Sequence, residues 1–171
     1  MGQSATKQSH AIKLEPPRFE NGKALLIAGL RSHYAPETMN GLPSQWQRFA
    51  PHIGKIPGQL GRATYGVSWC PNDSPDIEYL CGVEVSNFSS LPGEFTIVSI
   101  PAQRYAVFTH LGHVSTIRET IGAIGTQWFP DSGQEPAART GEAPDFFELY
   151  TEEFDPRTGM GAMEVWIPVK S

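Results

Sequence analysis

The residue in this sequence best suited to chemistry is Glu148, which lies inside the apolar stretch DFFELY at positions 145–150. A carboxylate among aromatic side chains is costly to remove from water unless a positive charge or a hydrogen-bond donor meets it. Tyr150 follows two residues later, so in an extended strand both side chains point to the same face. Aromatic walls around a carboxylate suit an organic cation, whereas a carboxylate with a raised pKa can instead serve as a general base.

The two closing strands are expected to sort these side chains between two faces of a sheet, because neighbouring residues of a strand alternate. One apolar face is expected to pack under the helices as a core made of Phe147, Leu149, Met163, Val165 and Ile167. The opposite face then carries the candidate ligand-binding residues Phe146, Glu148, Tyr150 and Trp166, together with Glu164. A plainer alternative is that Glu148 and Glu164 simply point at water.

The elements that position these residues occur twice. Residues 24–85 and 94–168 each contain a strand, a helical pattern and two further strands, and the first strand of the second half is expected over residues 95–112. A single shift of about 82 residues relates Trp46 to Trp128, Tyr65 to Phe147 and Val83 to Val165. The sequence therefore predicts an α+β fold of two β-α-β-β units related by a pseudo-two-fold axis, with an antiparallel sheet that forms a central ligand groove.

The chain is expected to divide into a tail and one domain. Residues 1–18 are predicted to form a flexible N-terminal tail, since they are mostly polar and include a Pro-Pro pair near their end. The domain is expected to cover residues 19–171, with halves at about 19–86 and 94–170 joined by the loop SNFSSLPGE, residues 86–94. With 171 residues, the chain is long enough for one domain with its own core.

The same shift, applied backwards, identifies candidates in the first half. It places Gly66 at the position of Glu148 and Gly82 at the position of Glu164. Glycines at positions where the second half has large side chains would leave open space on the facing side of a cleft. The first-half residues expected to complete the pocket are Tyr65, Trp69 and Glu84. Strand alternation places the first two of these on the core face, so their part in the pocket stays open.

Motifs in the second half resemble those of a known family. PAQRYAVFTHLG, QWFPDSG, DFFELY, FDPRTGMG and EVWIPV occur in this order between residues 101 and 169. They resemble the GyrI-like small-molecule-binding domain, the effector-binding module of AraC- and MerR-type transcription regulators that also occurs as a stand-alone protein. The resemblance covers residues 20–170 and implies two β-α-β-β units with a ligand groove between them. It also implies binding of lipophilic cations, with Glu148 as the family's glutamate and Tyr150 and Trp166 as wall residues.

Three functions follow from the residues and the resemblance. The first is binding or sequestration of a small, hydrophobic, cationic drug or toxin by a stand-alone effector-binding protein. The second is hydrolysis of reactive cyclopropane-bearing cytotoxins, with Glu148 as general base and Tyr150 orienting an oxygen atom. The third is inhibition of a protein partner such as DNA gyrase. Binding without turnover is the preferred hypothesis, so the protein is expected to be a binder more than an enzyme.

Composition and charge argue against other classes. A formal net charge of −5 disfavours nucleic acid as a direct partner, because DNA binding needs a basic surface. Because only about 20 residues precede the first expected strand, a helix-turn-helix domain is not expected among them. No apolar segment approaches membrane-spanning length, so a cytoplasmic location is expected. The polar N-terminus does not resemble a signal peptide, although Gly2 and Thr6 fit the loose myristoylation pattern.

The remaining candidates favour structural roles. Cys70 and Cys81 are expected to stay reduced. His110 and His113 have no accompanying cysteine or carboxylate cluster, so neither a metal nor another cofactor is expected. No nucleotide-binding or nucleophile-elbow fingerprint occurs. Trp46 is expected to pack in the core.

Overall fold

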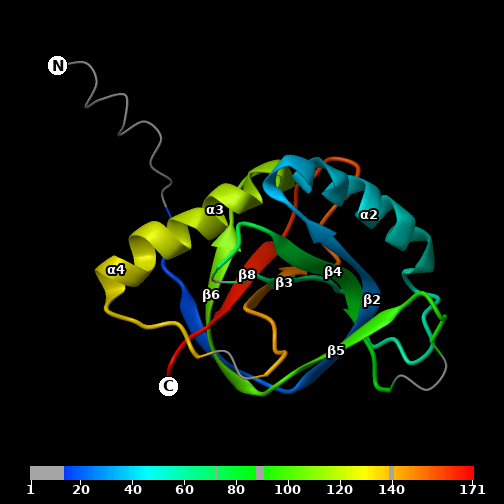
Figure 1. Cartoon of the computed structure of the whole chain (residues 1–171), viewed down its shortest axis with the longest axis horizontal. Coiled ribbons are helices and arrows are strands. Elements are labelled where there is room, and N and C mark those ends of the chain that lie inside the picture. The colour runs from blue at the N-terminus through cyan, green and yellow to red at the C-terminus, as the bar shows by residue number, and fades with distance from the viewer. Residues whose placement is uncertain (1–13, 72, 88–90, 139–140) are drawn as a thin grey trace, which may run out of the picture.

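Eight strands build one antiparallel sheet in the computed structural model of the chain, which describes residues 14–71, 73–87, 91–138 and 141–171 (Figure 1). The strands are β1 (Arg18–Gly22), β2 (Leu25–Tyr34), β3 (Thr64–Trp69), β4 (Ile77–Glu84), β5 (Thr96–Ile100), β6 (Gln103–His110), β7 (Phe146–Tyr150) and β8 (Met163–Pro168). Their order across the sheet is β1-β6-β8-β7-β3-β4-β2-β5, and every adjacent pair runs antiparallel.

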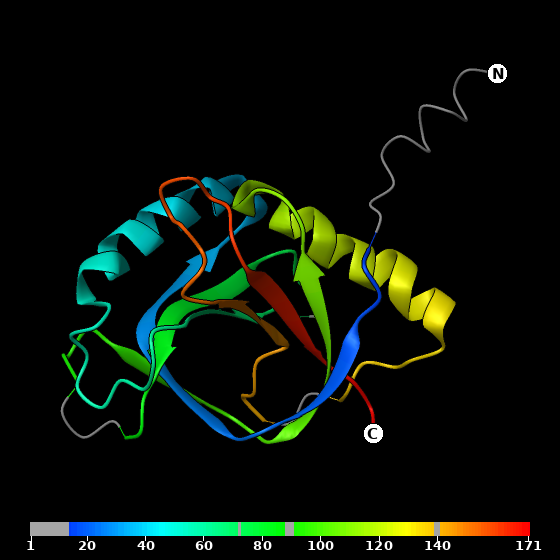
Figure 2. The same ribbon diagram turned by 180° about the vertical axis from the view of Figure 1, so that it is seen from behind.

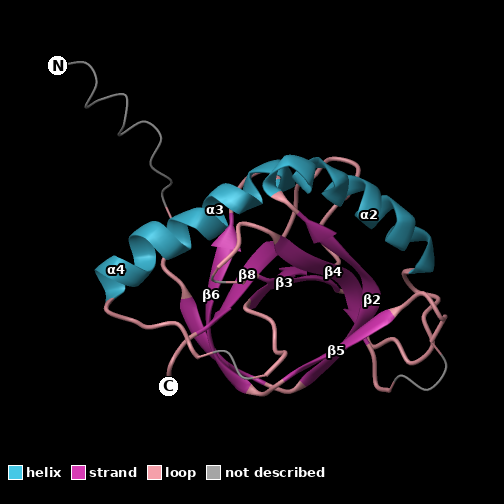
Figure 3. Cartoon of the chain, in the orientation of Figure 1, coloured by secondary structure: helices cyan, strands magenta, loops and turns pink. Residues whose placement is uncertain are grey.

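Helices lie on one outer side of the curled sheet, as Figure 3 shows. They are α2 (Leu42–Phe49), α3 (Ile117–Ala123) and α4 (Phe129–Ser132), with a π-helical turn (Ile124–Trp128) between the last two and short 3-10 turns at Pro36–Gly41, Ala50–His52 and Val114–Thr116. From α3 to α4 the chain forms one rod, which ends where Gly133 takes a left-handed conformation with φ of 74°. Side chains of α2 pack on β2 and β4, whereas those of the rod pack on β6 and β8.

The two halves of the sheet repeat one another. The series β1-β2-α2-β3-β4 has its counterpart in β5-β6-α3-β7-β8, and the strand order is the same from either edge once counterparts are exchanged. The centre of the sheet is the β3–β7 pair, in which Gly66 lies opposite Glu148. This order agrees with the duplicated α+β fold that the sequence predicts.

The sheet curls until its two edges meet in a single ribbon (Figure 2). The β1–β6 and β2–β5 ladders share one register, in which Arg18 faces Val107, Gly22 faces Gln103, Leu25 faces Ile100 and Gly29 faces Thr96. Only Lys23 and Ala24 separate β1 from β2, so this β1–β2/β5–β6 ribbon runs from one half of the sheet into the other. The single strand expected at 95–112 is in fact two, and it breaks at Pro101, which has no N–H to donate to a ladder.

Because the sheet closes on itself, its central strands β3 and β4 are buried on both faces. An interior cluster lines the concave face and includes Ile27, Tyr65, Val67, Leu80, Tyr105, Val107 and Phe147. Two outer clusters lie beneath the helices, one around Phe49, Tyr79 and Val83 and the other around Phe108, Ile117 and Met163. The expectation of a single core face is therefore wrong, and the face that a side chain takes decides its role.

The start of the domain lies slightly earlier than expected. β1 begins at Arg18, inside the predicted tail, and Leu14 already packs against the cluster beneath α3. Residues 1–13 are outside the described part of the chain, and so is the pattern formed by Gly2 and Thr6. No helix among the described residues is long and apolar enough to cross a membrane.

Candidate functional site

Glu148 lies in the middle of β7 and is almost fully buried, with 3% of its surface exposed. Its Oε1 accepts a hydrogen bond from the Tyr150 hydroxyl at 2.6 Å and another from the Tyr79 hydroxyl at 2.9 Å. The indole Nε1 of Trp46, on α2, donates to the same Tyr79 hydroxyl at 3.2 Å. Side chains from β4, β7 and α2 therefore hold Glu148 on the face of the sheet that the helices cover.

A glycine in the central strand pair makes this arrangement possible. Gly66 of β3 is buried and lies directly opposite Glu148. A Cβ atom at this position would overlap the Tyr79 hydroxyl and lie 2.8 Å from Oε1 of Glu148. The Tyr79 side chain therefore reaches from β4 across β3, over Gly66, to a carboxylate on β7.

Glu148 has no positively charged partner within the described residues. Both tyrosine hydrogen bonds reach Oε1, and Oε2 accepts none from the described part of the chain. Burial raises the pKa of Glu148 above its ordinary value of 4.5, and the hydrogen bonds from Tyr150 and Tyr79 and the charge of Arg118 offset only part of that effect. The open oxygen Oε2 is therefore available to a cation, a proton or a water molecule.

Both tyrosines remain hydrogen-bond donors. Burial, together with the neighbouring Glu148 charge, raises the pKa of Tyr79 and of Tyr150 well above 10. Each hydroxyl therefore keeps its proton at physiological pH, and both protons point to the same carboxylate oxygen. The tyrosines orient Glu148 without neutralising its charge.

Aromatic rings enclose the carboxylate on the helix side. The Trp46 ring lies 5.5 Å from that of Tyr150, at an interplanar angle of 77°, and 6.4 Å from that of Tyr79. The Phe154 ring approaches Tyr150 at 5.0 Å. Phe146 lies two residues before Glu148 on the same strand face and packs against the cluster beneath α3. A carboxylate surrounded in this way by ring faces and edges suits an organic cation.

The β7–β8 register overturns the expected partner on β8. Phe147 lies opposite Trp166 and Glu148 opposite Val165, so Trp166 belongs to the interior face. The rings of Phe147 and Trp166 stack there, with centroids 5.5 Å apart and an interplanar angle of 16°. The expectation that Phe147 and Leu149 share a core with the apolar residues of β8 is wrong, because a change of one residue in register exchanges the faces.

Glu164 also lies on the interior face and not beside Glu148. It is opposite Leu149, and its carboxylate oxygens accept hydrogen bonds from Arg18 at 2.9 Å and from the Trp166 indole at 3.0 Å. The predicted pair of carboxylates on one face is therefore wrong. Glu164 has a cationic partner, whereas Glu148 has none among the described residues.

The three first-half candidates lie on the interior face as well. Tyr65 packs in the interior cluster, where burial raises the pKa of its hydroxyl to about 12. Glu84 forms an ion pair with Lys23 at 3.0 Å. The ring of Trp69 lies 3.9 Å from the guanidinium carbon of Arg31. The sheet therefore separates Tyr65, Trp69 and Glu84 from the Glu148 site.

Two residues of the site were not among the sequence-derived ligand contacts. Tyr79 is not predicted from the sequence, and only a packing role is predicted for Trp46. Gly66 could have indicated Tyr79, because a glycine in a central strand leaves room for a side chain that crosses it. Gly66 faces Cys81 on β4, and Tyr79 lies two residues before Cys81 on the same face. Trp46 touches both outer clusters, so it lies above the centre of the sheet where the two halves meet.

The histidine pair and the cysteines take structural places. His110 is buried, with Nδ1 at 2.8 Å from the Thr120 hydroxyl and Nε2 at 2.9 Å from the main-chain oxygen of His113. Cys70 and Cys81 are not joined by a disulfide, and burial raises the pKa of the Cys81 thiol to about 12. Across the described ranges, no three His, Cys, Asp or Glu side chains are grouped as metal ligands.

Fold and site together define a duplicated α+β domain of the small-molecule-binding kind. The family model of the GyrI-like small molecule binding domain matches residues 15–170, and the chain belongs to this family. The transcriptional regulator BrlR of Pseudomonas aeruginosa is 27% identical over 165 residues, which are 95% of this chain and 56% of that protein. The chain thus spans little more than half the length of this curated relative.

Solved structures share the fold at low sequence identity. SAV2435 bound to tetraphenylphosphonium matches with a TM-score of 0.69 and 18% identity, over 92% of this chain and 95% of that one. A hydrolase from Listeria innocua matches with a TM-score of 0.56 and 10% identity, over 99% of this chain and 98% of that one. The architecture is therefore common to a protein with a bound lipophilic cation and to a hydrolase.

Proposed function

We propose that this chain binds a hydrophobic organic cation against Glu148, between the sheet and α2. The observation that carries the proposal is the buried carboxylate, whose Oε2 has neither a hydrogen-bond donor nor an ion-pair partner among the described residues and is influenced only by the more distant charge of Arg118. An unpaired charge is costly inside a protein. A ligand that supplies the missing positive charge offsets that cost, and the rings of Trp46 and Tyr150 favour a cation over a neutral molecule.

The related proteins support a cation as the ligand class but do not identify the ligand of this chain. SAV2435 is described with tetraphenylphosphonium, a lipophilic cation, and the family is one of small-molecule binders. At 18% identity, the likeness to SAV2435 supports a common fold but does not show that this chain binds the same ligand. The ligand class proposed for this chain therefore rests on Glu148 and the aromatic rings around it.

Entry of the ligand requires a movement of Trp46. Glu148 exposes only 3% of its surface, whereas Trp46 is partly exposed and covers Tyr79 and Tyr150. Rotation of this one side chain would uncover the carboxylate while the strands stay in place. The ligand would then lie between the Tyr150 ring and the displaced indole, so that both rings still line the site.

The decisive experiment compares two ions of the same shape and opposite charge, tetraphenylphosphonium and tetraphenylborate, by isothermal titration calorimetry. We expect saturable binding of the phosphonium ion and binding of the borate ion that is weaker by about tenfold or more. The two ions bury similar apolar areas, so the difference reports the charge of the site. Equal affinities would show that apolar surface alone binds the ligand, and the proposal would fail.

The affinity for the cation is expected to increase with pH. Burial raises the pKa of Glu148 above 4.5, so the carboxyl group keeps its proton at pH values where an exposed glutamate has lost it. A cation binds the charged form, so affinity is present above the raised pKa and is lost as pH falls through it. Binding should also release a proton, which calorimetry in buffers of different ionisation enthalpy measures. An affinity that does not change with pH would contradict the role of Glu148.

A second candidate function is hydrolysis, with Glu148 as the general base. Its raised pKa makes the carboxylate more basic than an exposed one, and Oε2 is open to a water molecule. The substrates would be the reactive cyclopropane-bearing cytotoxins implied by the sequence resemblance. Glu148 would take a proton from water while the water oxygen attacks a carbon of the strained ring, and the breaking carbon–carbon bond would release its electrons into the conjugated system of the substrate. The resulting anion would take up the proton that Glu148 returns through solvent, so the product is the substrate plus one water and the carboxylate is regenerated. Tyr150 would keep the carboxylate oriented.

Mass spectrometry separates hydrolysis from sequestration. Catalysis predicts many product molecules per protein, each heavier than the substrate by one water, and loss of product formation in Glu148→Gln. Recovery of intact substrate from the protein supports sequestration alone. Tyr150→Phe should slow turnover less than Glu148→Gln, because Tyr79 still orients the carboxylate.

A further inference from the structure

A hollow lies beside the interior face of the sheet, away from Glu148. Its volume is about 350 Å³, and its lining includes Arg31, Trp69, Ile97, Val98, Pro101 and Glu142. Sites for one small organic molecule usually have volumes of about 300–1,000 Å³. None of these residues contributes to the cation site proposed above, so the two sites can be considered separately.

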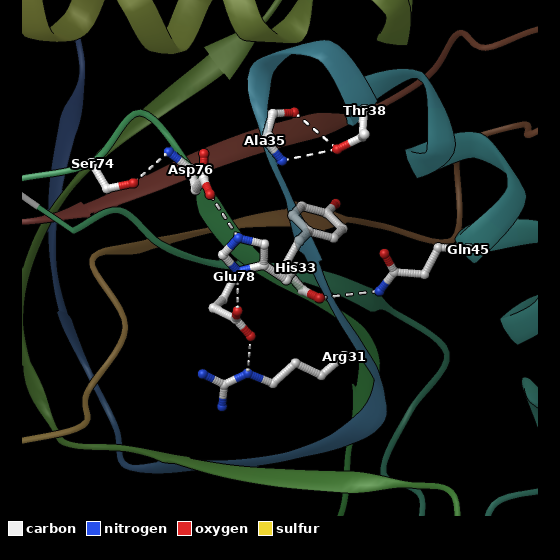
Figure 4. A network of polar contacts seen from close by, with 9 residues as sticks. Arg31, His33, Ala35, Thr38, Gln45, Ser74, Asp76 and Glu78 are labelled. Carbon is white, nitrogen blue, oxygen red and sulfur yellow. Dashed lines mark hydrogen bonds and ion pairs between the residues drawn. The ribbon is translucent and has the colours of Figure 1, made fainter.

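Arg31 is held in a fixed orientation in this hollow. Its guanidinium carbon lies 3.9 Å from the centroid of the Trp69 ring, and its Nε donates to Oε1 of Glu78 at 3.1 Å. The two terminal nitrogens point away from Glu78 in Figure 4 and make no hydrogen bond within the described residues. A guanidinium that is stacked on a ring and anchored through Nε presents its outer fork to a ligand.

Arg31 belongs to a network of four charged side chains beside the hollow. Glu78 also accepts from Nδ1 of His33 at 2.6 Å, and Nε2 of His33 lies 2.8 Å from Asp76 (Figure 4). A carboxylate only accepts hydrogen bonds, so both ring nitrogens carry protons when both contacts form. The hydrogen bonds to Asp76 and Glu78 accordingly raise the pKa of His33. Arg31 and protonated His33 together balance Asp76 and Glu78, so a ligand would be recognised by the open fork of Arg31 and not by an excess of positive charge.

The geometry points to a binding site for a small aromatic monocarboxylate. The ligand carboxylate would accept two parallel hydrogen bonds from the terminal nitrogens of Arg31, the pairing for which a guanidinium fork is shaped. The ligand ring would pack against the apolar side chains of Val98 and Pro101.

The opposite wall of the hollow restricts the charge of the ligand. The Trp69 indole donates to the main-chain oxygen of Glu142 at 2.9 Å, which fixes this segment beside the ring. The exposed Glu142 carboxylate repels negative charge in the hollow, and this cost increases with each charge that the ligand carries. A monoanion therefore fits this site better than a dianion.

The test uses 2-naphthoate and its neutral amide, 2-naphthamide, titrated by calorimetry into the full-length protein. We expect saturable naphthoate binding and affinity for the amide that is lower by about tenfold. Arg31→Gln should lower naphthoate affinity by a similar factor, and Arg31→Lys should lower it less because the charge remains without the fork. Lys23→Gln, which removes an exposed cation that pairs with Glu84 outside the hollow, is the matched control and should change nothing.

Several results would overturn the inference. They are equal affinities for naphthoate and naphthamide, equal losses in Arg31→Gln and Lys23→Gln, or no saturable binding at all. Displacement of naphthoate by tetraphenylphosphonium would place both molecules in one site and would also refute it. Unchanged naphthoate binding in Glu148→Gln is expected, so failure of either site leaves the other intact.

Discussion

Glu148→Gln is expected to lower the affinity for tetraphenylphosphonium about 30-fold or more, because the loss of a buried charged partner typically costs at least about 2 kcal/mol. Glutamine has the shape of glutamate, so Tyr79 and Tyr150 keep an acceptor for their hydroxyls. The affinity for neutral triphenylphosphine oxide should therefore change by less than about threefold. Calorimetry of both ligands on both proteins measures the difference. Similar losses for the two ligands would falsify the charge role.

Glu164→Gln is the matched control for this experiment. Glu164 is also a glutamate in a central strand, but it lies on the interior face and pairs with Arg18. Its replacement should leave phosphonium binding unchanged. Glu148→Gln should also be at least as stable as the parent above the ordinary pKa of 4.5, since the parent must either hold a buried charge or keep a proton there. A destabilised Glu148→Gln protein would show that the carboxylate serves the fold.

Gly66→Ala is expected to lower the free energy of unfolding by about 1–3 kcal/mol, the usual cost of overpacking. The added Cβ would overlap the Tyr79 hydroxyl and crowd Oε1 of Glu148. Tyr79 and Glu148 must then move apart, so phosphonium binding should weaken in the same variant. Urea denaturation measures the stability and calorimetry the affinity.

Gly122→Ala provides the control for a glycine replaced elsewhere. A Cβ at Gly122, in α3, meets no atom within 4 Å, and alanine favours a helix over glycine by up to about 1 kcal/mol. This variant should therefore be slightly more stable than the parent and bind normally. In a Tyr79→Phe background the overlapping oxygen is gone, so Gly66→Ala should cost less there. A penalty of the same size in both backgrounds would mean that Tyr79 is not the residue displaced.

One half of the candidate site is predictable from the sequence, because it depends on a single strand. Phe146, Glu148 and Tyr150 alternate within β7, and they share a face whatever strand lies beside them. Trp166 requires the register between β7 and β8, which depends on the connection at residues 151–162. Sequence alternation does not report that register, and an error of one residue moves Trp166 to the opposite face.

The duplication is predictable for a similar reason, whereas the closure of the sheet is not. The common shift of about 82 residues needs only the sequence, and it holds for β3 and β7, where Gly66 faces Glu148. Between β4 and β8 the shift is 84, because Gly66 faces Cys81 and Glu148 faces Val165 (165 − 81 = 84). The β1–β2/β5–β6 ribbon joins segments that are far apart along the chain, and it buries both faces of the central strands. Tyr65 and Tyr79 are consequently both buried, one in the interior and one beneath α2. Apolar residues on both faces remove the contrast on which a face assignment relies.

The β1–β2/β5–β6 ribbon also bears on how the protein can be divided. Each half gives its first strand to the other half, since β1 pairs with β6 and β5 with β2. The chain thus resembles a domain-swapped dimer in which two similar units have exchanged their first strands and are joined by a covalent connector. A cut in the connector would leave two fragments, each with an arm that has lost its neighbour, and these fragments are expected to find each other again and reassemble. Independent folding of either half is not expected, so the protein should melt as one cooperative unit.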